Sequence, residues 1–339
     1  MTLADRPALT VVLITPDRFR SVRRTVSHLR AQTARDQMEL LIVAPAGVEI
    51  DLDDPSVAAA VEGIHTVRVL SVPDISPGGR ARGAGVRAAR APVVAFAEDH
   101  CFPDRDWAAA LIRAHRERWA GVGPVIRNAN PETAVSRADL FIGYGRWLAP
   151  GHAGTVNYLP GHNSSYKREC LLEFGDALDA LLEAETVLQW ELRRLGHELY
   201  LEPAAAAAHV NFALWRSWMP VQLLNGRLFA ATRATRWTLR QRLAFAAAAP
   251  LIPLVRFQRA LRHAVNAGVP WTVIASTAPV LAIGVVIDGV GQLLGYALGP
   301  GDAAVRAAEF EHHRERHVTV SDRLRLGPLV APREVRALT

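Results

Sequence analysis

The chain has 339 residues, half of them hydrophobic, and a formal net charge of +6. This length suits about two domains, and the large apolar fraction indicates that part of the surface faces lipid. Lys167 is the only lysine, so the positive charge comes from arginines spread along the chain, which favours a phosphate-rich substrate or an anionic membrane and argues against a nucleic-acid partner.

Apolar runs alternate with helical patterns over roughly the first 100 residues. Strands are predicted at residues 9–15, 39–44, 67–72 and 93–96, and helices at 21–32 and 80–90. This rhythm, about 30 residues for each strand and helix, is typical of a doubly wound, mostly parallel sheet. The pattern therefore predicts a Rossmann-like α/β nucleotide-binding half.

The alternation continues with longer gaps between the elements. A helix is predicted at 106–119, a strand at 121–126, a helix at 181–195 and a strand at 197–202. Residues 143–160, rich in glycine, proline and aromatic side chains, are expected to form a loop that folds over a bound ligand. The alanine run 204–208 is interpreted as low-complexity sequence.

Arginine-rich and apolar segments follow residue 212. The apolar run 243–255 is too short to cross a bilayer, which needs about 20 residues, whereas 271–298 reaches that length but contains Pro279 and Asp288. Arginines lie before and between these runs: Arg227, Arg233, Arg236, Arg240, Arg242, Arg256, Arg259 and Arg262. The pattern predicts membrane contact, with two buried core helices as the alternative. The charged segment 309–317 is expected to be a solvated face.

Glu98, Asp99 and His100 directly follow the buried strand at 93–96. Chemistry in α/β sheets is found at the carboxyl ends of the strands. Two carboxylates and an imidazole supply oxygen and nitrogen ligands that suit Mg²⁺ or Mn²⁺ holding phosphates. A solvated acidic turn is the alternative interpretation of these residues.

Four segments stand out in chain order: VVLITPDRFRSVRRTVSHLRAQT, GGRARGAGVRAARAPVVAFAEDH, PGHNSSYKREC and LEAETVLQWELRRLGHELYLEPAAAAAH. Together they resemble the family 2 glycosyltransferases of the GT-A fold. The first looks like the family's opening strand and turn, and the second like the helix and strand that lead into its DXD motif. The third looks like an acceptor-side Gly-x-Asn segment, and the fourth like the Glu-Asp helix with the strand and histidine that follow it. The resemblance covers about residues 8–210 and implies transfer of a sugar from a nucleotide-sugar donor.

The resemblance also implies roles for the acidic cluster and the later helix. Glu98 holds the first DXD position, near the ribose, and His100 the last, where the family normally has an aspartate that binds the metal. Histidine keeps metal ligation possible and shifts the preference toward Mn²⁺, with Asp99 sharing the role. Glu185 aligns with the second acid of the Glu-Asp pair and is the candidate base, while Ala184 replaces the first acid.

The remaining assignments follow from the same resemblance. Donor binding is assigned to Thr15, Asp17, Arg82, Glu98 and Asp99, acceptor binding to His162, Asn163 and Ser164, and metal binding to Asp99, His100 and His209. Glu183 is the alternative base. His209 could instead be an ordinary core histidine, and 161–165 an ordinary turn. The predicted strand 39–44 ends in Ala44 and Pro45 where the family usually has acids, so the donor nucleotide stays open.

We therefore expect a metal-dependent, inverting glycosyltransferase that uses Mn²⁺ or Mg²⁺ and acts on a lipid-linked or cell-envelope glycan acceptor at the cytoplasmic face of the cell membrane. The catalytic domain is predicted at 1–212, membrane-associating helices at 213–300 and a charged tail at 301–339. Because Ala184 replaces an acid, a catalytically inactive, membrane-bound binding protein is the alternative. A nucleotidyltransferase would need a glycine-rich loop with a lysine after the first strand, and TPDRFRS has neither residue.

Overall fold

The computed structural model describes residues 6–161 and 163–326. The chain divides into two compact units that interleave in sequence. Unit 1 contains the residues up to 125, 152–208 and those from 319 onward, and unit 2 contains 126–151 and 209–318. The predicted functional domains are continuous stretches of chain rather than compact units, and they stay a prediction.

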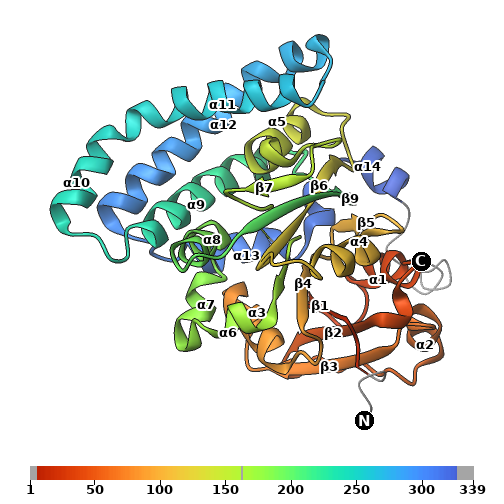
Figure 1. Cartoon of the computed structure of the whole chain (residues 1–339). Helices are drawn as coiled ribbons and strands as arrows, with labels where there is room; N and C mark the ends of the chain where they lie inside the picture. The colour runs from red at the N-terminus through yellow and green to blue at the C-terminus, as the bar shows by residue number, and fades with distance from the viewer. Residues whose placement is uncertain (1–5, 162, 327–339) are drawn as a thin grey trace. The chain divides into compact units, whose positions relative to one another are not determined.

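Four parallel strands form the centre of unit 1 (Figure 1). They are β1 (Leu9–Ile14), β2 (Met38–Pro45), β3 (Thr66–Val72) and β4 (Val93–Ala97), in the spatial order β3-β2-β1-β4. Nearly all side chains of β1, β2 and β4 are buried, which explains why these strands read as continuous apolar runs. The four predicted strands are confirmed to within one residue at each end.

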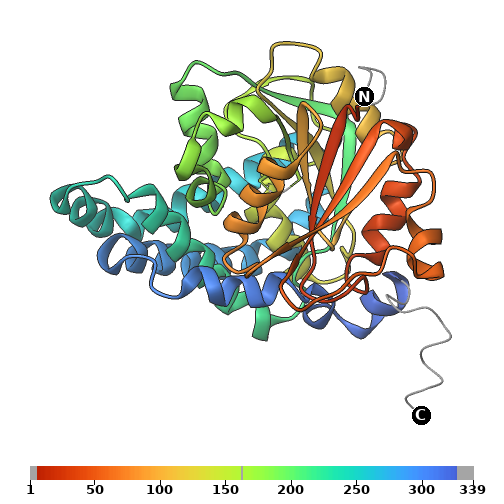
Figure 2. The ribbon, with the colours of Figure 1, turned by 90° about the horizontal axis from the view of Figure 1, so that it is seen from below.

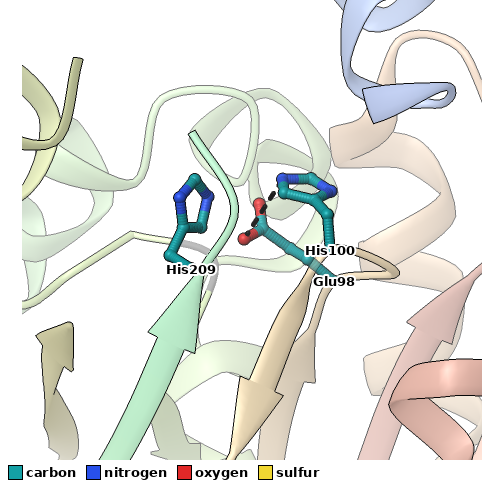
Figure 3. Close-up of side chains that lie close together, drawn as sticks. All are labelled: Glu98, His100 and His209. Carbon is teal, nitrogen blue, oxygen red and sulfur yellow. Dashed lines mark ion pairs between the residues drawn. The ribbon is translucent and has the colours of Figure 1, made fainter. Parts of the chain in front are cut away.

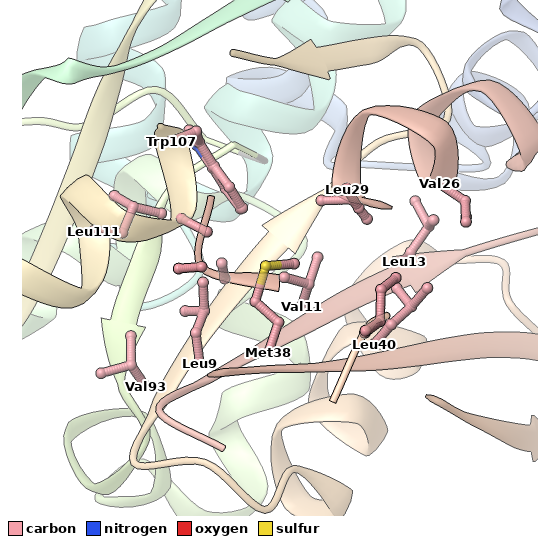
Figure 4. Close-up of a cluster of buried hydrophobic side chains, with 14 of the residues drawn as sticks. Leu9, Val11, Leu13, Val26, Leu29, Met38, Leu40, Val93, Trp107 and Leu111 are labelled. Atoms are coloured by element: carbon pink, nitrogen blue, oxygen red, sulfur yellow. The ribbon is translucent and has the colours of Figure 1, made fainter. Parts of the chain in front are cut away.

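Helices cover both faces of these strands. They are α1 (Arg23–Arg30) and α2 (Pro55–Val61) on one face and α3 (Gly78–Ala88) on the other, as Figure 2 shows for the red and orange part of the chain. Because side chains alternate along a strand, β1 contributes to two cores. Val11 and Leu13 pack with Leu29 of α1 (Figure 4), whereas Val12 packs with Val86 of α3.

The sheet continues past β4 with shorter or less apolar strands. β8 (Ser165–Lys167) pairs antiparallel with both β4 and β6 (Gly121–Asn128), and β9 (Leu199–His209), β5 (Cys101–Pro103) and β7 (Gly154–Val156) complete it. Two predictions from the sequence differ from the structure. The alanine run 204–208 is part of β9, and the expected loop 143–160 contains β7 and a 3₁₀ turn, η3 (Gly145–Trp147). Alanine and glycine favour strands little, so pairing with neighbouring strands decides their structure.

The register of the parallel strands brings two turns together at one edge of the sheet. Leu13 lies opposite Ala97, so the turn after β1 and the turn after β4 are neighbours. The carboxyl edge of the parallel strands is the place where the sequence predicts the site.

The other elements of unit 1 are η2 (Arg35–Gln37), α4 (Trp107–Ala114), α6 (Arg168–Leu172), η4 (Gly175–Ala177), α7 (Leu178–Leu181), α8 (Glu185–Arg194) and α14 (Val320–Leu326).

Unit 2 is mainly helical. Its elements are α5 (Ala134–Tyr144), α9 (Trp215–Arg233), α10 (Leu239–Ala248), η5 (Ala249–Leu251), α11 (Ile252–Asn266), α12 (Trp271–Leu298), α13 (Ala303–Glu311) and η6 (Arg314–His317). Within the described residues, α12 alone is long and apolar enough to cross a membrane, by length and composition. It packs closely on α9, since a Cβ added at Gly291 would lie 2.2 Å from the carbonyl oxygen of Leu223.

Part of the charged segment 309–317 is packed inside unit 2, so its prediction as a solvated face is wrong for Arg314 and His317, whereas Glu309 and Arg316 are exposed. Arg314 is 4% exposed, and its guanidinium carbon lies 3.6 Å from the centre of the Phe212 ring. His317 Nδ1 is 2.8 Å from the Ser217 hydroxyl. A guanidinium can be buried against an aromatic face because the ring attracts the cation and the planar group stacks on it.

Candidate active site

The turn after β4 places an imidazole between two carboxylates. Asp99 Oδ1 lies 2.6 Å from His100 Nδ1, and Glu98 Oε2 lies 3.7 Å from His100 Nε2. The side chains of all three residues are at most 10% exposed. Thr25 of α1 donates a hydrogen bond of 2.9 Å to the carbonyl oxygen of Glu98, which ties the turn to the helix that covers β1. The acidic cluster is therefore a fixed, largely buried turn, and the alternative of a solvated turn does not hold.

His209 is the last residue of β9, so the sheet carries it to the same edge as the turn after β4. Figure 3 shows its side chain together with those of Glu98 and His100. One donor atom from each of these three residues lies within 4.8 Å of the others. A carboxylate and two imidazoles are a ligand set that suits a divalent cation, Mn²⁺ better than Mg²⁺.

In both histidines, the ring nitrogen Nδ1 contacts a side-chain oxygen of a neighbouring residue. His100 Nδ1 faces Asp99, and His209 Nδ1 lies 3.0 Å from Asn211 Oδ1. Since these oxygens are hydrogen-bond acceptors, they place the hydrogen on Nδ1 and leave Nε2 as the ligating atom. Partners of this kind orient metal-binding histidines in proteins. The residues present therefore fit a divalent metal ion.

Asn163 and Ser164 lie beside this turn and use their polar groups differently. Asn163 Nδ2 donates to Glu98 Oε2 over 3.0 Å, whereas the Ser164 hydroxyl donates to the carbonyl oxygen of Pro160 inside its own loop. Ser164 is fully buried, and its carbonyl oxygen accepts from the amide of Phe96 in β4. Their roles in acceptor binding stay a prediction, and His162 lies outside the described residues.

Glu185 is the first residue of α8 and is 7% exposed. Its Oε1 lies 3.4 Å from Nη1 of Arg82, which also donates to the carbonyl oxygen of Leu182 over 3.1 Å. A Cβ added at Gly161 would lie 3.0 Å from Glu185 Oε2, so the backbone at this glycine lies close to the carboxylate. The structure thus brings Arg82, predicted to bind the donor, into contact with the candidate base.

Gly161 and Asn163 lie next to the carboxylates of Glu185 and Glu98, respectively. Asn163 donates a hydrogen bond to Glu98. Residues two apart in a chain are at most about 7 Å from each other. Glu98 and Glu185, far apart in sequence, therefore border the same short loop. Glu183, the alternative base, instead accepts a hydrogen bond of 2.7 Å from the amide of Gly79 at the start of α3, which gives it a structural task.

Thr15 and Asp17 shape the turn after β1. The Thr15 hydroxyl lies 2.9 Å from the Ser21 hydroxyl, and Asp17 Oδ1 accepts from the amide and the hydroxyl of Ser21 at 3.1 and 3.0 Å. These contacts hold the loop that neighbours the turn after β4. Donor binding by the two side chains stays a prediction.

The model of glycosyl transferase family 2 matches residues 10–175. These residues belong to glycosyl transferase family 2. The match begins in β1 and ends after α6, so it contains the turn with Glu98, Asp99 and His100 and the loop with Asn163. The resemblance seen in the sequence is confirmed for this part of the chain.

A solved structure supports the GT-A fold. A mannosyltransferase from Pyrobaculum calidifontis, in complex with GDP-Man and Mn²⁺, is 16% identical with a TM-score of 0.50, covering 92% of this chain and 88% of that one. A GalNAc-T7 structure with UDP, GalNAc and Mn²⁺ is also 16% identical, with a TM-score of 0.47. That match covers 62% of this chain and 44% of the other, so the chain spans under half of that protein's length. No protein in the search of curated proteins matches the sequence.

The candidate site also depends on residues that the sequence did not point out. Thr25, which bonds the Glu98 carbonyl, is 73 positions away and lies in an amphipathic helix, where a threonine carries no functional signal. Asn211 follows His209 by two positions and orients its ring. A polar residue two positions after a candidate metal-binding histidine is a weak signal that could have been used.

Proposed function

We propose that this family 2 glycosyltransferase moves a sugar from a nucleotide-diphosphate donor to a lipid-linked or cell-envelope glycan acceptor, with inversion at the anomeric carbon and with a divalent metal ion. The observation that carries the proposal is the ligand set at the end of β4, where Glu98 faces two histidines whose Nδ1 atoms are held by Asp99 and Asn211. Glu98, His100 and His209 would hold a divalent cation there, which would supply positive charge to stabilise the diphosphate.

Glu185 is the proposed general base. Its carboxylate takes the proton from the acceptor hydroxyl as that oxygen forms a bond to the anomeric carbon. The bond from this carbon to the diphosphate oxygen breaks, and the nucleoside diphosphate leaves with the electron pair. Arg82 holds the Glu185 carboxylate at 3.4 Å and so keeps it oriented for this proton transfer. Attack opposite the leaving group inverts the configuration.

The acceptor and the location rest on the composition of unit 2. A helix as apolar as α12 and the arginines near it favour an enzyme that acts at the cytoplasmic face of the cell membrane, where lipid-linked acceptors are present. The solved Mn²⁺ complexes with GDP-Man and with UDP and GalNAc are consistent with nucleotide-sugar donors in general.

Release of nucleoside diphosphate from a panel of nucleotide sugars, with added Mn²⁺, tests the function. Glu185→Gln and His100→Ala should each lower turnover by about 100-fold or more, because one removes the base and the other a metal ligand. Glu191→Gln, in the same helix, and His197→Ala are the matched controls and should keep wild-type rates. Circular dichroism should show all four variants folded.

Wild-type turnover in Glu185→Gln or in His100→Ala would contradict the role given to that residue. The absence of turnover with every donor, despite binding of a nucleotide sugar, would favour the inactive binding protein that Ala184 suggests. Thermal shift with each nucleotide sugar separates these outcomes, since a ligand that binds the folded state raises its melting temperature.

A further inference from the structure

Unit 2 exposes large apolar side chains on three consecutive helices. They are Leu239, Leu243 and Phe245 of α10, Leu254, Val255 and Val265 of α11, and Trp271, Ile283, Val286, Val290, Leu293 and Leu298 of α12, each at least 38% exposed. We call this set the apolar face. Single exposed apolar residues are ordinary, but this many on successive helices mark a surface that is covered by something other than water.

The exposed side chains of α12 form one stripe. Ile283, Val286, Val290 and Leu293 follow each other at intervals of three, four and three, which places them on one side of a helix. The opposite side is used for packing inside unit 2. There a Cβ on Gly291 would lie 2.2 Å from a backbone oxygen of α9, and one on Gly295 would lie 2.3 Å from another. One side of α12 therefore packs against protein, and the other side carries an exposed apolar stripe.

This packing is unsuited to a helix that crosses a bilayer. Asp288, near the middle of α12, is 4% exposed and forms an ion pair of 3.0 Å with Arg256 of α11. Its neighbour α11 has 15 residues and α10 has 10, both short of the roughly 20 that span the hydrocarbon core. Insertion of α12 across a membrane would leave these arginine-bearing neighbours in the hydrocarbon or break the contacts with them.

The charged residues of segment 203–287, which contains α10, α11 and most of α12, indicate what covers the apolar face. Residues 203–287 contain no aspartate, glutamate or lysine, and the charged side chains are all arginines: Arg216, Arg227, Arg233, Arg236, Arg240, Arg242, Arg256, Arg259 and Arg262. Arg240, Arg259 and Arg262 are exposed on the helices that carry the apolar face. Arginines beside exposed leucines match the phosphates and acyl chains of an anionic leaflet, and an exposed Trp271 suits the interface between them.

We propose that α10, α11 and α12 bind in the plane of one membrane leaflet that contains anionic phospholipids, with the apolar face at the level of the acyl chains, and that the chain does not cross the bilayer. The proposal deepens the membrane location given under the proposed function and does not depend on the catalytic roles of Glu98 or Glu185. Its partner is the phospholipid itself.

Vesicle flotation of the full chain tests the binding. Wild-type protein should float with vesicles of phosphatidylcholine and phosphatidylglycerol and much less with phosphatidylcholine alone, and high salt should weaken the binding. The triple variant Leu243→Glu, Leu254→Glu and Val290→Glu should bind at least about tenfold more weakly, because charged side chains do not enter the acyl region. Leu195→Glu, at a side chain 46% exposed in unit 1, is the matched control and should bind as wild type.

A second variant tests the charge. Arg259→Gln with Arg262→Gln should lose the preference for anionic vesicles, whereas Arg113→Gln with Arg116→Gln, at exposed arginines of unit 1, should keep it. Circular dichroism and donor turnover of each variant, measured without vesicles, separate loss of membrane binding from loss of fold or catalysis.

Three results would overturn the proposal. The first is wild-type protein that does not float with anionic vesicles, and the second is an equal loss of binding in the control variants. The third is protein that resists extraction of cell membranes with alkaline carbonate, which is the behaviour of a spanning helix. A concentration-dependent dimer that the triple variant abolishes, without vesicle binding, would assign the apolar face to a second copy of the chain.

Discussion

The two units of the molecule arrange polar and apolar residues in opposite ways. Unit 1 buries continuous apolar strands and places Glu98, Asp99 and His100 at the end of one of them. Unit 2 buries polar groups, Gln222, Asp288 and Arg314 among them, and exposes leucines, valines and Trp271 on its helices. Hydrophobic content alone therefore does not show whether a surface of this molecule faces water or lipid. The two patterns suit a catalytic sheet in water and helices at a lipid boundary.

Acidification should affect unit 1 through His115, and this is the largest effect on stability that we expect. Burial lowers the pKa of His115 to about 3, while its Nε2 contacts the Ser165 hydroxyl at 2.9 Å. The folded state therefore holds this ring neutral, and its contribution is present above pH 6.5 and is lost as pH falls through 6.5 toward 3. The loss is on the order of 5 kcal/mol by about pH 3, from 1.36 kcal/mol per pK unit.

Urea unfolding at several pH values measures this dependence. His115→Gln should be less stable at neutral pH and should lose less on acidification than wild type. Equal slopes of unfolding free energy against pH in the two proteins would show that another group carries the acid sensitivity.

Asp139 should matter most in unit 2, because its partly buried carboxylate accepts three hydrogen bonds. They come from the amide of Phe212 at 3.0 Å, the Trp218 indole at 3.0 Å and the Gln222 amide at 2.9 Å. Asp139→Ala leaves these donors without the carboxylate and should lower the unfolding free energy by about 3 kcal/mol. The control Asp302→Ala, at a side chain 64% exposed, should change it by less than about 0.5 kcal/mol.

Asp139 also gives unit 2 a pH dependence of the opposite sign to that of His115. Burial raises the pKa of Asp139 to about 6 from 3.8. The stabilisation from holding this proton is fully present below pH 3.8 and is lost as pH rises through about 6. Asp139→Asn should remove that component. An unchanged profile between pH 4 and 7 in Asp139→Asn would contradict the assignment.

Gly291→Ala should produce a smaller effect by forcing α12 away from α9. The added methyl group would meet the carbonyl oxygen of Leu223, which cannot move independently of its helix. We expect a loss of about 2 kcal/mol in chemical unfolding. Gly143→Ala in α5 is the matched control, since nothing lies within 4 Å of its added Cβ, and alanine there should stabilise by up to about 1 kcal/mol. The account of close packing fails if the two substitutions have the same effect.

The parallel strands and the turn after β4 could be predicted because local pattern determines them. A strand buried on both faces must be apolar throughout, and a polar cluster at its end is visible in a single segment of sequence. The strand at 204–208 could not be predicted, since alanine favours no strand and pairing with neighbours decides its structure. Burial of Arg314 depends on the distant ring of Phe212, which no local pattern shows.

The candidate site divides in the same way. The residue types at Glu98, His100 and Glu185 are visible in sequence, whereas their partners are distant in the chain. Asn163 reaches Glu98 across 65 positions, and Arg82 reaches Glu185 from another helix. Only the fold shows that these contacts place both acidic groups beside one short loop.

The most direct test of the central claim is the rate of nucleoside diphosphate release by protein treated with EDTA, measured as Mn²⁺ is added back in the presence of the nucleotide sugar that stabilises it most. We predict no release without metal, full recovery with Mn²⁺ in wild type, and no recovery in His100→Ala. Full release in EDTA, or recovery in His100→Ala equal to wild type, would contradict a metal-dependent transferase centred on the turn after β4.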